Sequence, residues 1–86
     1  MPEHPMLRHL SDLESWFEPG AARDYDPVEL VRYALGGSDY WADLALGWME
    51  QGVRGEGLTQ ALLLLEGQEG RPQSLRDRAR RVRQSL

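Results

Sequence analysis

Residues 25–52, YDPVELVRYALGGSDYWADLALGWMEQG, carry the clearest folding signals in the chain. Asp26 suits the position before a helix, because its carboxylate can accept a hydrogen bond from backbone N–H groups of the first turn. Pro27 suits the first helical position, where its missing N–H would have had no partner. Glu29 can reach back as in a capping box. The stretch therefore predicts a helix that begins just after Asp26.

A second helix is expected immediately after the first. Gly36 and Gly37 follow the last apolar residues of the first helix, and we expect them to supply the positive φ that commonly ends a helix. Ser38 can cap the next helix. Its apolar residues recur with helical spacing at Trp41, Leu44, Ala45, Trp48 and Met49. The short connection predicts that the two helices form an antiparallel hairpin.

Upstream, apolar residues at helical spacing predict another helix that ends before Pro19. Two starts are compatible with the sequence. Pro5 can occupy the first turn, or Ser11 can cap the helix, in which case residues 1–10 form a loose N-terminal arm.

Two further helices are expected downstream. The stretch LTQALLLLEG, residues 58–67, is apolar on many sides, which is typical of a central helix. Residues 71–86, RPQSLRDRARRVRQSL, predict a basic C-terminal helix that Ser74 and Asp77 would cap. The apolar stripe of this last helix is narrow and consists of Leu75, Ala79, Val82 and Leu86.

The two predicted hairpins are related in sequence. A shift of 34 residues places Trp41, Asp43, Ala45 and Trp48 over Leu75, Asp77, Ala79 and Val82. This pairing resembles the helix pairs of HEAT-type repeat proteins, but two units are fewer than the three or more that such stacks need. We therefore assign no family.

Together these patterns predict an all-α fold, a single domain over residues 1–86 that forms a small bundle of four or five short helices built from antiparallel helical hairpins. A domain of this length buries only about 60 to 65% of its unfolded surface, so its core is small. The expected core consists of Leu10, Leu13, Phe17, Leu30, Val31, Ala34, Trp41, Leu44, Ala45, Trp48, Leu62 and Leu65.

Charge is divided unevenly along the chain. Residues 1–70 carry four Arg and thirteen Asp or Glu, a net charge of −9, whereas residues 71–86 carry six Arg and one Asp, a net charge of +5. A nucleic-acid contact, a partner-docking surface or a solvated helix would each account for the basic end. We expect the basic helix to pack on the acidic body through its apolar stripe, since an exposed ion pair contributes only about 0 to 1 kcal/mol.

Several chemistries are excluded or disfavoured. The chain has no cysteine, which excludes disulfides, thiolate catalysis and cysteine metal sites. It has none of the common nucleotide-binding or hydrolase motifs, so we expect no enzyme activity and no cofactor. A metal site of His4, His9 and Asp12 is conceivable, but we expect the two histidines to be surface residues and no metal to be bound.

The location and the function follow from the same composition. No apolar stretch approaches the roughly 20 residues that span a bilayer, and the N-terminal residues lack a signal-peptide pattern. We therefore expect a soluble cytoplasmic protein that does not enter a membrane. Its predicted role is that of a protein–protein interaction module, most simply a homodimer, whose further partner the sequence does not identify. The alternative is nucleic-acid binding through the C-terminal helix. The candidate partner-binding residues are Tyr40, Leu63, Leu64, Arg76, Arg80 and Arg83.

Overall fold

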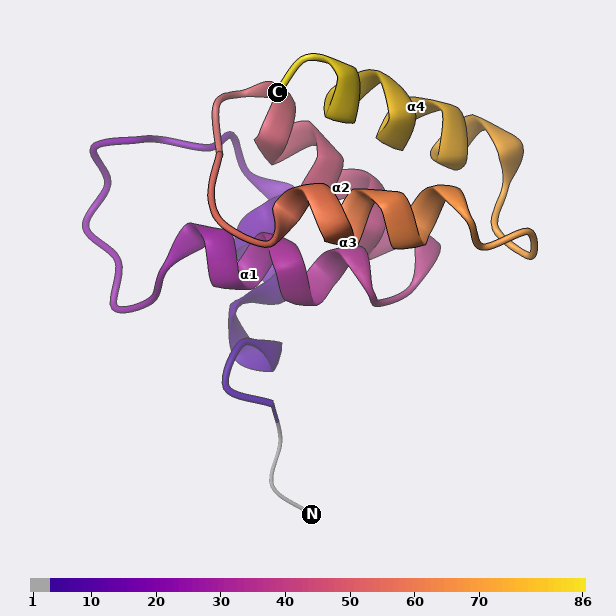
Figure 1. Ribbon diagram of the computed structural model, residues 1–86. Helices are drawn as coiled ribbons and strands as arrows, with labels where there is room; N and C mark the ends of the chain where they lie inside the picture. Colours follow the sequence, from indigo (N-terminus) through magenta and orange to yellow (C-terminus); the bar gives the residue numbers. More distant parts are fainter. Residues whose placement is uncertain (1–3) are drawn as a thin grey trace.

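A computed structural model describes residues 4–86 and contains only helices within that range (Figure 1). The elements are the 3₁₀ helix η1 (Leu7–Glu14) and the α-helices α1 (Pro27–Leu35), α2 (Asp39–Glu50), α3 (Leu58–Glu66) and α4 (Gln73–Gln84). The Cα radius of gyration is 12.3 Å, close to the roughly 12 Å expected for a folded chain of this length. The predicted all-α bundle is confirmed.

The bundle consists of two helical hairpins. Helix α1 packs on α2 and α3 packs on α4, while α1 also contacts α3 and α2 contacts α4. Helices α3 and α4 run in opposite directions, as do α1 and α2 (Figure 1). The 3₁₀ helix η1 lies against α2 and α1. The two hairpins thus face each other through all four α-helices.

Both predicted N-caps of the first hairpin are observed, but the capping box is not, because the Glu29 carboxylate pairs with Arg32 instead of reaching back to the start of the helix. Asp26 Oδ1 accepts a hydrogen bond of 2.9 Å from Val28 N, with Pro27 as the first helical residue. Ser38 Oγ accepts a longer hydrogen bond of 3.5 Å from Trp41 N. Each start is determined by residues next to it in the sequence, and for that reason it could be predicted.

The prediction of a positive φ at the end of α1 is wrong. Gly36 has a φ of −89°, and its N–H donates to Tyr33 O over 3.2 Å, so a tightened last turn ends the helix. Positive φ values occur instead at Gly52, which follows α2, and at Gly57, which precedes α3.

The first helix begins at Leu7 and ends at Glu14, without a side-chain cap. A start at Ser11 is therefore not observed, and residues 7–10 belong to the helix rather than to a loose arm. Leu10 and Leu13 are buried beneath it. Residues 1–3 of the proposed arm lie outside the described range.

The capping box predicted for the basic helix is also absent. Helix α4 begins at Gln73, one residue before Ser74, and follows Pro72 without a side-chain cap. Asp77 instead accepts a hydrogen bond of 2.8 Å from the side-chain amide of Gln73. Pro72 restricts the backbone ahead of the helix, and its own missing N–H needs no partner there.

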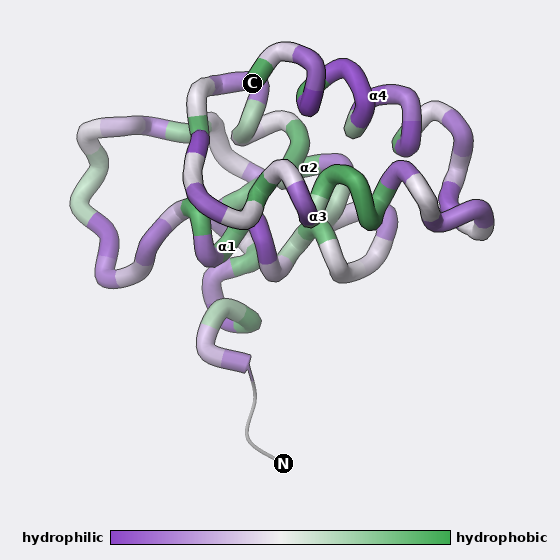
Figure 2. The backbone as a smooth tube through the Cα atoms, viewed as in Figure 1, coloured by the Kyte–Doolittle hydropathy of each residue, from purple (hydrophilic) through white to green (hydrophobic). Residues whose placement is uncertain are grey.

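The core includes nine of the twelve predicted residues, and it is centred on α2 rather than on α3. Phe17, Trp41 and Leu44 are only partly buried. Helix α2 is covered by η1, α1 and α4, so it also buries residues outside its predicted stripe, namely Ala42 and Leu46. Helix α3 is the most apolar of the helices (Figure 2). It contacts only α1 and α4 and leaves two leucines at the surface.

Every helix among residues 4–86 is too short to cross a bilayer, the longest having 12 residues where a span needs about 20.

Candidate functional site

The basic helix α4 packs on the bundle through its apolar stripe, as the sequence predicts. Leu75, Ala79 and Val82 are buried. Leu86 follows the end of the helix and remains 48% exposed, so the buried stripe is one residue shorter than expected. Figure 2 shows the contrast between the mainly hydrophilic α4 and the mainly hydrophobic α3 on which it packs. The buried stripe therefore turns the arginines of α4 toward the edges of its contact with the body.

Arg78 joins α4 to α2 through two carboxylates. Its guanidinium donates to Glu50 over 2.5 and 3.1 Å and to Asp43 Oδ1 over 2.5 Å. These hydrogen bonds raise the pKa of Arg78, and the hydrogen bond from Arg78 lowers the pKa of Glu50 despite partial desolvation. Gly47 lies beside this group, and a Cβ there would be in ordinary van der Waals contact with Arg78 Nη2, at 3.4 Å.

Three other arginines of α4 converge on Glu66, the last residue of α3. Arg83 donates two hydrogen bonds to the Glu66 carboxylate, of 2.5 and 3.0 Å, and Arg80 Nε lies 3.7 Å from the same carboxylate. Arg76 Nε donates to the Glu66 backbone carbonyl over 2.9 Å, which satisfies an acceptor at the helix end. The hydrogen bonds from Arg83 lower the pKa of Glu66.

Arg71 links the two hairpins just before α4. It donates to Asp39 Oδ1 over 2.8 Å and to Gly37 O over 2.7 Å. Of the six basic residues in 71–86, Arg81 alone makes no ion pair or hydrogen bond within the described chain. The basic end of the chain is thus largely neutralised by the acidic body.

The six candidate partner-binding residues do not form one surface. Arg76, Arg80 and Arg83 surround Glu66. Leu63 and Leu64 are exposed on α3, at 50% and 69%, but point about 100° apart around the helix axis. Tyr40 is exposed at the start of α2, where its hydroxyl donates to the Glu14 carboxylate and its pKa is raised mainly by that hydrogen bond.

Leu64 does belong to a larger apolar surface at the end of α1. One cleft, of about 320 Å³, lies between α1 and α3 and is lined by Leu35, Ala61 and Leu64. A second, of about 590 Å³, lies between α1, η1 and the start of α2. Arg32 and Gly36 line both clefts, so the clefts adjoin. We call this the α1-end surface, and its main side chains are those of Leu7, Tyr33, Trp41, Ala61 and Leu64.

The α1-end surface carries little charge. Among residues 4–86, Arg32 is the one residue with a charged side chain that lines either cleft. Its guanidinium pairs with Glu29 one turn earlier on α1. A partner that covered this surface would therefore lose few favourable interactions between charges and water.

A second candidate surface surrounds Trp16, a residue that was not among the predicted partner-binding residues. The indole is 78% exposed and lines two clefts, of about 280 and 330 Å³. Trp48 forms a wall common to both clefts. The position of Trp16 off the apolar stripe of Leu10, Leu13 and Phe17 was the one signal in the sequence that could have marked it as a surface residue.

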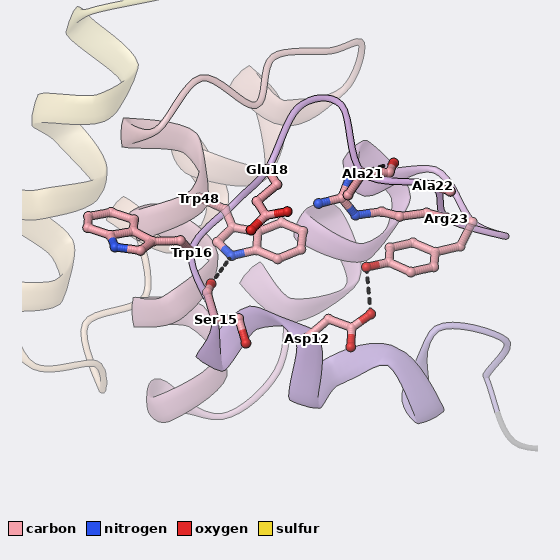
Figure 3. A pocket seen from close by; sticks show the side chains of 9 residues that line it. Asp12, Ser15, Trp16, Glu18, Ala21, Ala22, Arg23 and Trp48 are labelled. Atoms are coloured by element: carbon pink, nitrogen blue, oxygen red, sulfur yellow. Dashed lines mark hydrogen bonds between the residues drawn. The ribbon is translucent and has the colours of Figure 1, made fainter.

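The first of these clefts is shown in Figure 3. Arg23 projects toward the aromatic wall, with its Cζ 5.0 Å from the centre of the Phe17 ring and 5.4 Å from that of Trp48. Tyr25, which also lines this cleft, donates to Asp12 over 2.8 Å. Burial and the hydrogen bond to this carboxylate raise the pKa of Tyr25 to about 12. The cleft thus combines aromatic rings with charged groups of both signs.

The two histidine rings stack on two different tyrosines. The His4 ring stacks on Tyr33, with 4.0 Å between ring centres, and the His9 ring stacks on Tyr25, with 4.2 Å. His9 Nε2 lies 3.9 Å from the Asp24 carboxylate, whereas the Asp12 carboxylate accepts a hydrogen bond from Tyr25. Residues 4–86 contain no group of three potential metal ligands, so the conceivable site of His4, His9 and Asp12 does not form.

The chain matches no known protein family, no curated protein and no solved structure.

Proposed function

We propose that this protein is a small helical protein–protein interaction module, without catalytic activity, that forms a homodimer through the α1-end surface. The observation that carries the proposal is the pair of adjoining apolar clefts around Arg32 and Gly36. Leu64, beside one of them, is 69% exposed. Exposed apolar side chains that gather on one surface favour burial against another protein. The cytoplasmic location expected from the sequence belongs to the same proposal.

The low charge of the α1-end surface makes a second copy of the chain, related by a two-fold axis, a suitable partner for it. A two-fold axis places one patch against its own copy, so like charges on the patch would face each other. The α1-end surface avoids that repulsion because Arg32, the one charged residue in the described part of the chain that lines it, is paired with Glu29. Leucine, tyrosine and tryptophan side chains can then be buried with little loss of ionic hydration.

The alternative function, nucleic-acid binding, requires arginines that are free to contact phosphates. Arg71, Arg78, Arg80 and Arg83 are already paired with carboxylates of the body, and contact with phosphates would require those pairs to break or be shared. This arrangement favours the interaction module over nucleic-acid binding.

Sedimentation of the wild-type chain and of two variants, from low to high micromolar concentration, tests the proposal. The Leu64→Asp variant places a charge in the α1-end surface, whereas the control Leu86→Asp places the same charge on an exposed leucine outside both clefts. We expect the wild type and Leu86→Asp to dimerise and Leu64→Asp to remain monomeric. A monomeric wild type, or a Leu64→Asp variant that still dimerises, would contradict the proposal.

A further inference from the structure

Trp16 has an unusually exposed side chain for a large apolar residue. Among the large apolar side chains of residues 4–86 it is the most exposed, at 78%. It lies in the segment between η1 and α1, and the two clefts beside it share no lining residue with the α1-end surface. Trp16 therefore marks a second and separate surface.

The backbone on both sides of Trp16 is held by Trp48 of α2 and by Gln51, the residue that follows α2. Ser15 O accepts a hydrogen bond of 2.9 Å from the indole N–H of Trp48, and Phe17 N donates one of 2.6 Å to Gln51 Oε1. A partner that bound Trp16 would have little backbone left to order, which reduces the entropic cost of binding. Exposed tryptophans on such fixed supports are frequent anchors of protein interfaces.

The charges around Trp16 indicate the chemistry of the partner. Asp12 and Glu18 line the first cleft, and Glu14 and Asp43 line the second. Among the described residues, the two clefts contain only two positively charged groups to balance these four carboxylates, the guanidinium groups of Arg23 and Arg78. Arg78 is shared with a further carboxylate, that of Glu50, so the surface has an excess of negative charge.

The same surface already accommodates one guanidinium group against aromatic rings. Arg23 lies 5.0 Å from the ring centre of Phe17 and 5.4 Å from that of Trp48, within the range of a cation–π interaction. The exposed indole of Trp16 provides a further aromatic face of the same kind. An arginine or lysine of a partner could stack on it while carboxylates on either side pair with neighbouring basic residues.

We propose that Trp16 and its two acidic clefts bind a basic peptide segment of a different protein. A second copy of this chain is a poor occupant, because two such acidic surfaces would repel each other across a two-fold axis and the arginines of α4 are largely paired within their own chain. The surface thus gives the interaction module a second contact, independent of dimerisation.

Fluorescence anisotropy tests this inference with the full chain and a labelled peptide of alternating arginine and leucine. A peptide with glutamate in place of arginine serves as the probe of opposite charge. We expect the arginine peptide to bind, to bind less tightly at higher salt, and to bind better than the glutamate peptide. The Trp16→Ala substitution should weaken binding by roughly tenfold to thirtyfold, as at interface anchors. Equal binding of both peptides, or unchanged binding by Trp16→Ala, would overturn the proposal.

Two further pairs of variants distinguish peptide binding at the Trp16 clefts from attraction to the net negative charge of the protein and from dimerisation. Glu18→Gln, inside a cleft, should weaken binding several-fold, whereas Asp24→Asn, an exposed carboxylate outside both clefts, should not. Leu64→Ala should leave peptide binding unchanged, and Trp16→Ala should leave the dimer unchanged. Equal effects of Glu18→Gln and Asp24→Asn would show attraction to net charge alone and would contradict the proposed site.

Discussion

Replacement of Trp48 by alanine is expected to destabilise the bundle more than any other single tryptophan substitution. The side chain is 2% exposed, its indole N–H donates to Ser15 O over 2.9 Å, and its ring centre lies 5.2 Å from that of Phe17. Loss of a buried tryptophan side chain costs about 3 to 5 kcal/mol. An 86-residue domain has a total stability of roughly 4 to 13 kcal/mol, so this single change removes a large part of it.

The matched control for Trp48→Ala is Trp16→Ala, since the same residue type is removed from an exposed position. We expect Trp16→Ala to change the free energy of unfolding by about 0.5 kcal/mol or less. Trp48→Phe retains part of the ring but leaves Ser15 O without its donor, and should give an intermediate loss of about 1 to 3 kcal/mol. This variant keeps the comparison possible if Trp48→Ala does not fold.

Urea unfolding followed by far-ultraviolet circular dichroism measures these losses without depending on tryptophan fluorescence. The expected order of stability is wild type and Trp16→Ala, then Trp48→Phe, then Trp48→Ala. Equal losses for Trp16→Ala and Trp48→Ala would refute the placement of the two indoles, and so would a loss below about 1 kcal/mol for Trp48→Ala.

Three other predictions concern ion pairs, packing and nucleic acid. Arginine partners hold the pKa values of Glu50 and Glu66 below the ordinary 4.5. The stability that these ion pairs contribute should therefore be complete above pH 4.5 and decline as the pH falls through the lowered pKa values. Acid titration at a fixed urea concentration should show a less steep decline for Glu66→Gln than for the wild type. Gly55→Ala should cost about 1 to 3 kcal/mol, because its Cβ would lie 2.5 Å from Val28 Cγ2, and a double-mutant cycle should show that Val28→Ala relieves part of the cost. Duplex DNA should bind weakly even at low salt, whereas five or six free arginine contacts would give a log–log salt slope of about −5.

The helix starts of the first hairpin could be predicted because their causes are local. Asp26 and Ser38 each accept a hydrogen bond from an N–H two or three residues away, and such pairs are visible in the sequence. The end of α1 was mispredicted because Gly36 could end the helix either with a positive φ or with a tightened turn, and the short link to α2 adopts the second.

The central position of α2 could not be predicted from periodicity. Leu46 lies outside the apolar stripe of its helix and is buried because η1, α1 and α4 all cover α2. Leu63 and Leu64 are equally apolar but remain exposed because only α1 and α4 flank α3. Which helices cover which face depends on contacts between segments far apart in the chain, and a single helical pattern does not contain that information.

The candidate surfaces could likewise be predicted only in part. The excess of arginine in α4 and its apolar stripe were enough to predict that the helix docks on the body. The carboxylates that pair with these arginines could not be predicted, since Arg78 and its partner Asp43 are 35 positions apart in the sequence. Trp16 was missed because the sequence places it inside a predicted helix, whereas the observed helix ends at Glu14. Its exposure depends on the hydrogen bonds that hold Ser15 to Trp48 and Phe17 to Gln51.

Dimerisation through the α1-end surface can be tested most directly from the three tryptophan indole N–H signals in a series of ¹⁵N–¹H correlation spectra at increasing protein concentration. Trp41 lines a cleft of that surface, Trp16 lies outside both of its clefts, and Trp48 is buried in the core. The proposed homodimer predicts that the Trp41 signal shifts or broadens as the concentration rises, while the signals of Trp16 and Trp48 stay in place. Signals that are independent of concentration, or a shift confined to Trp16, would contradict it.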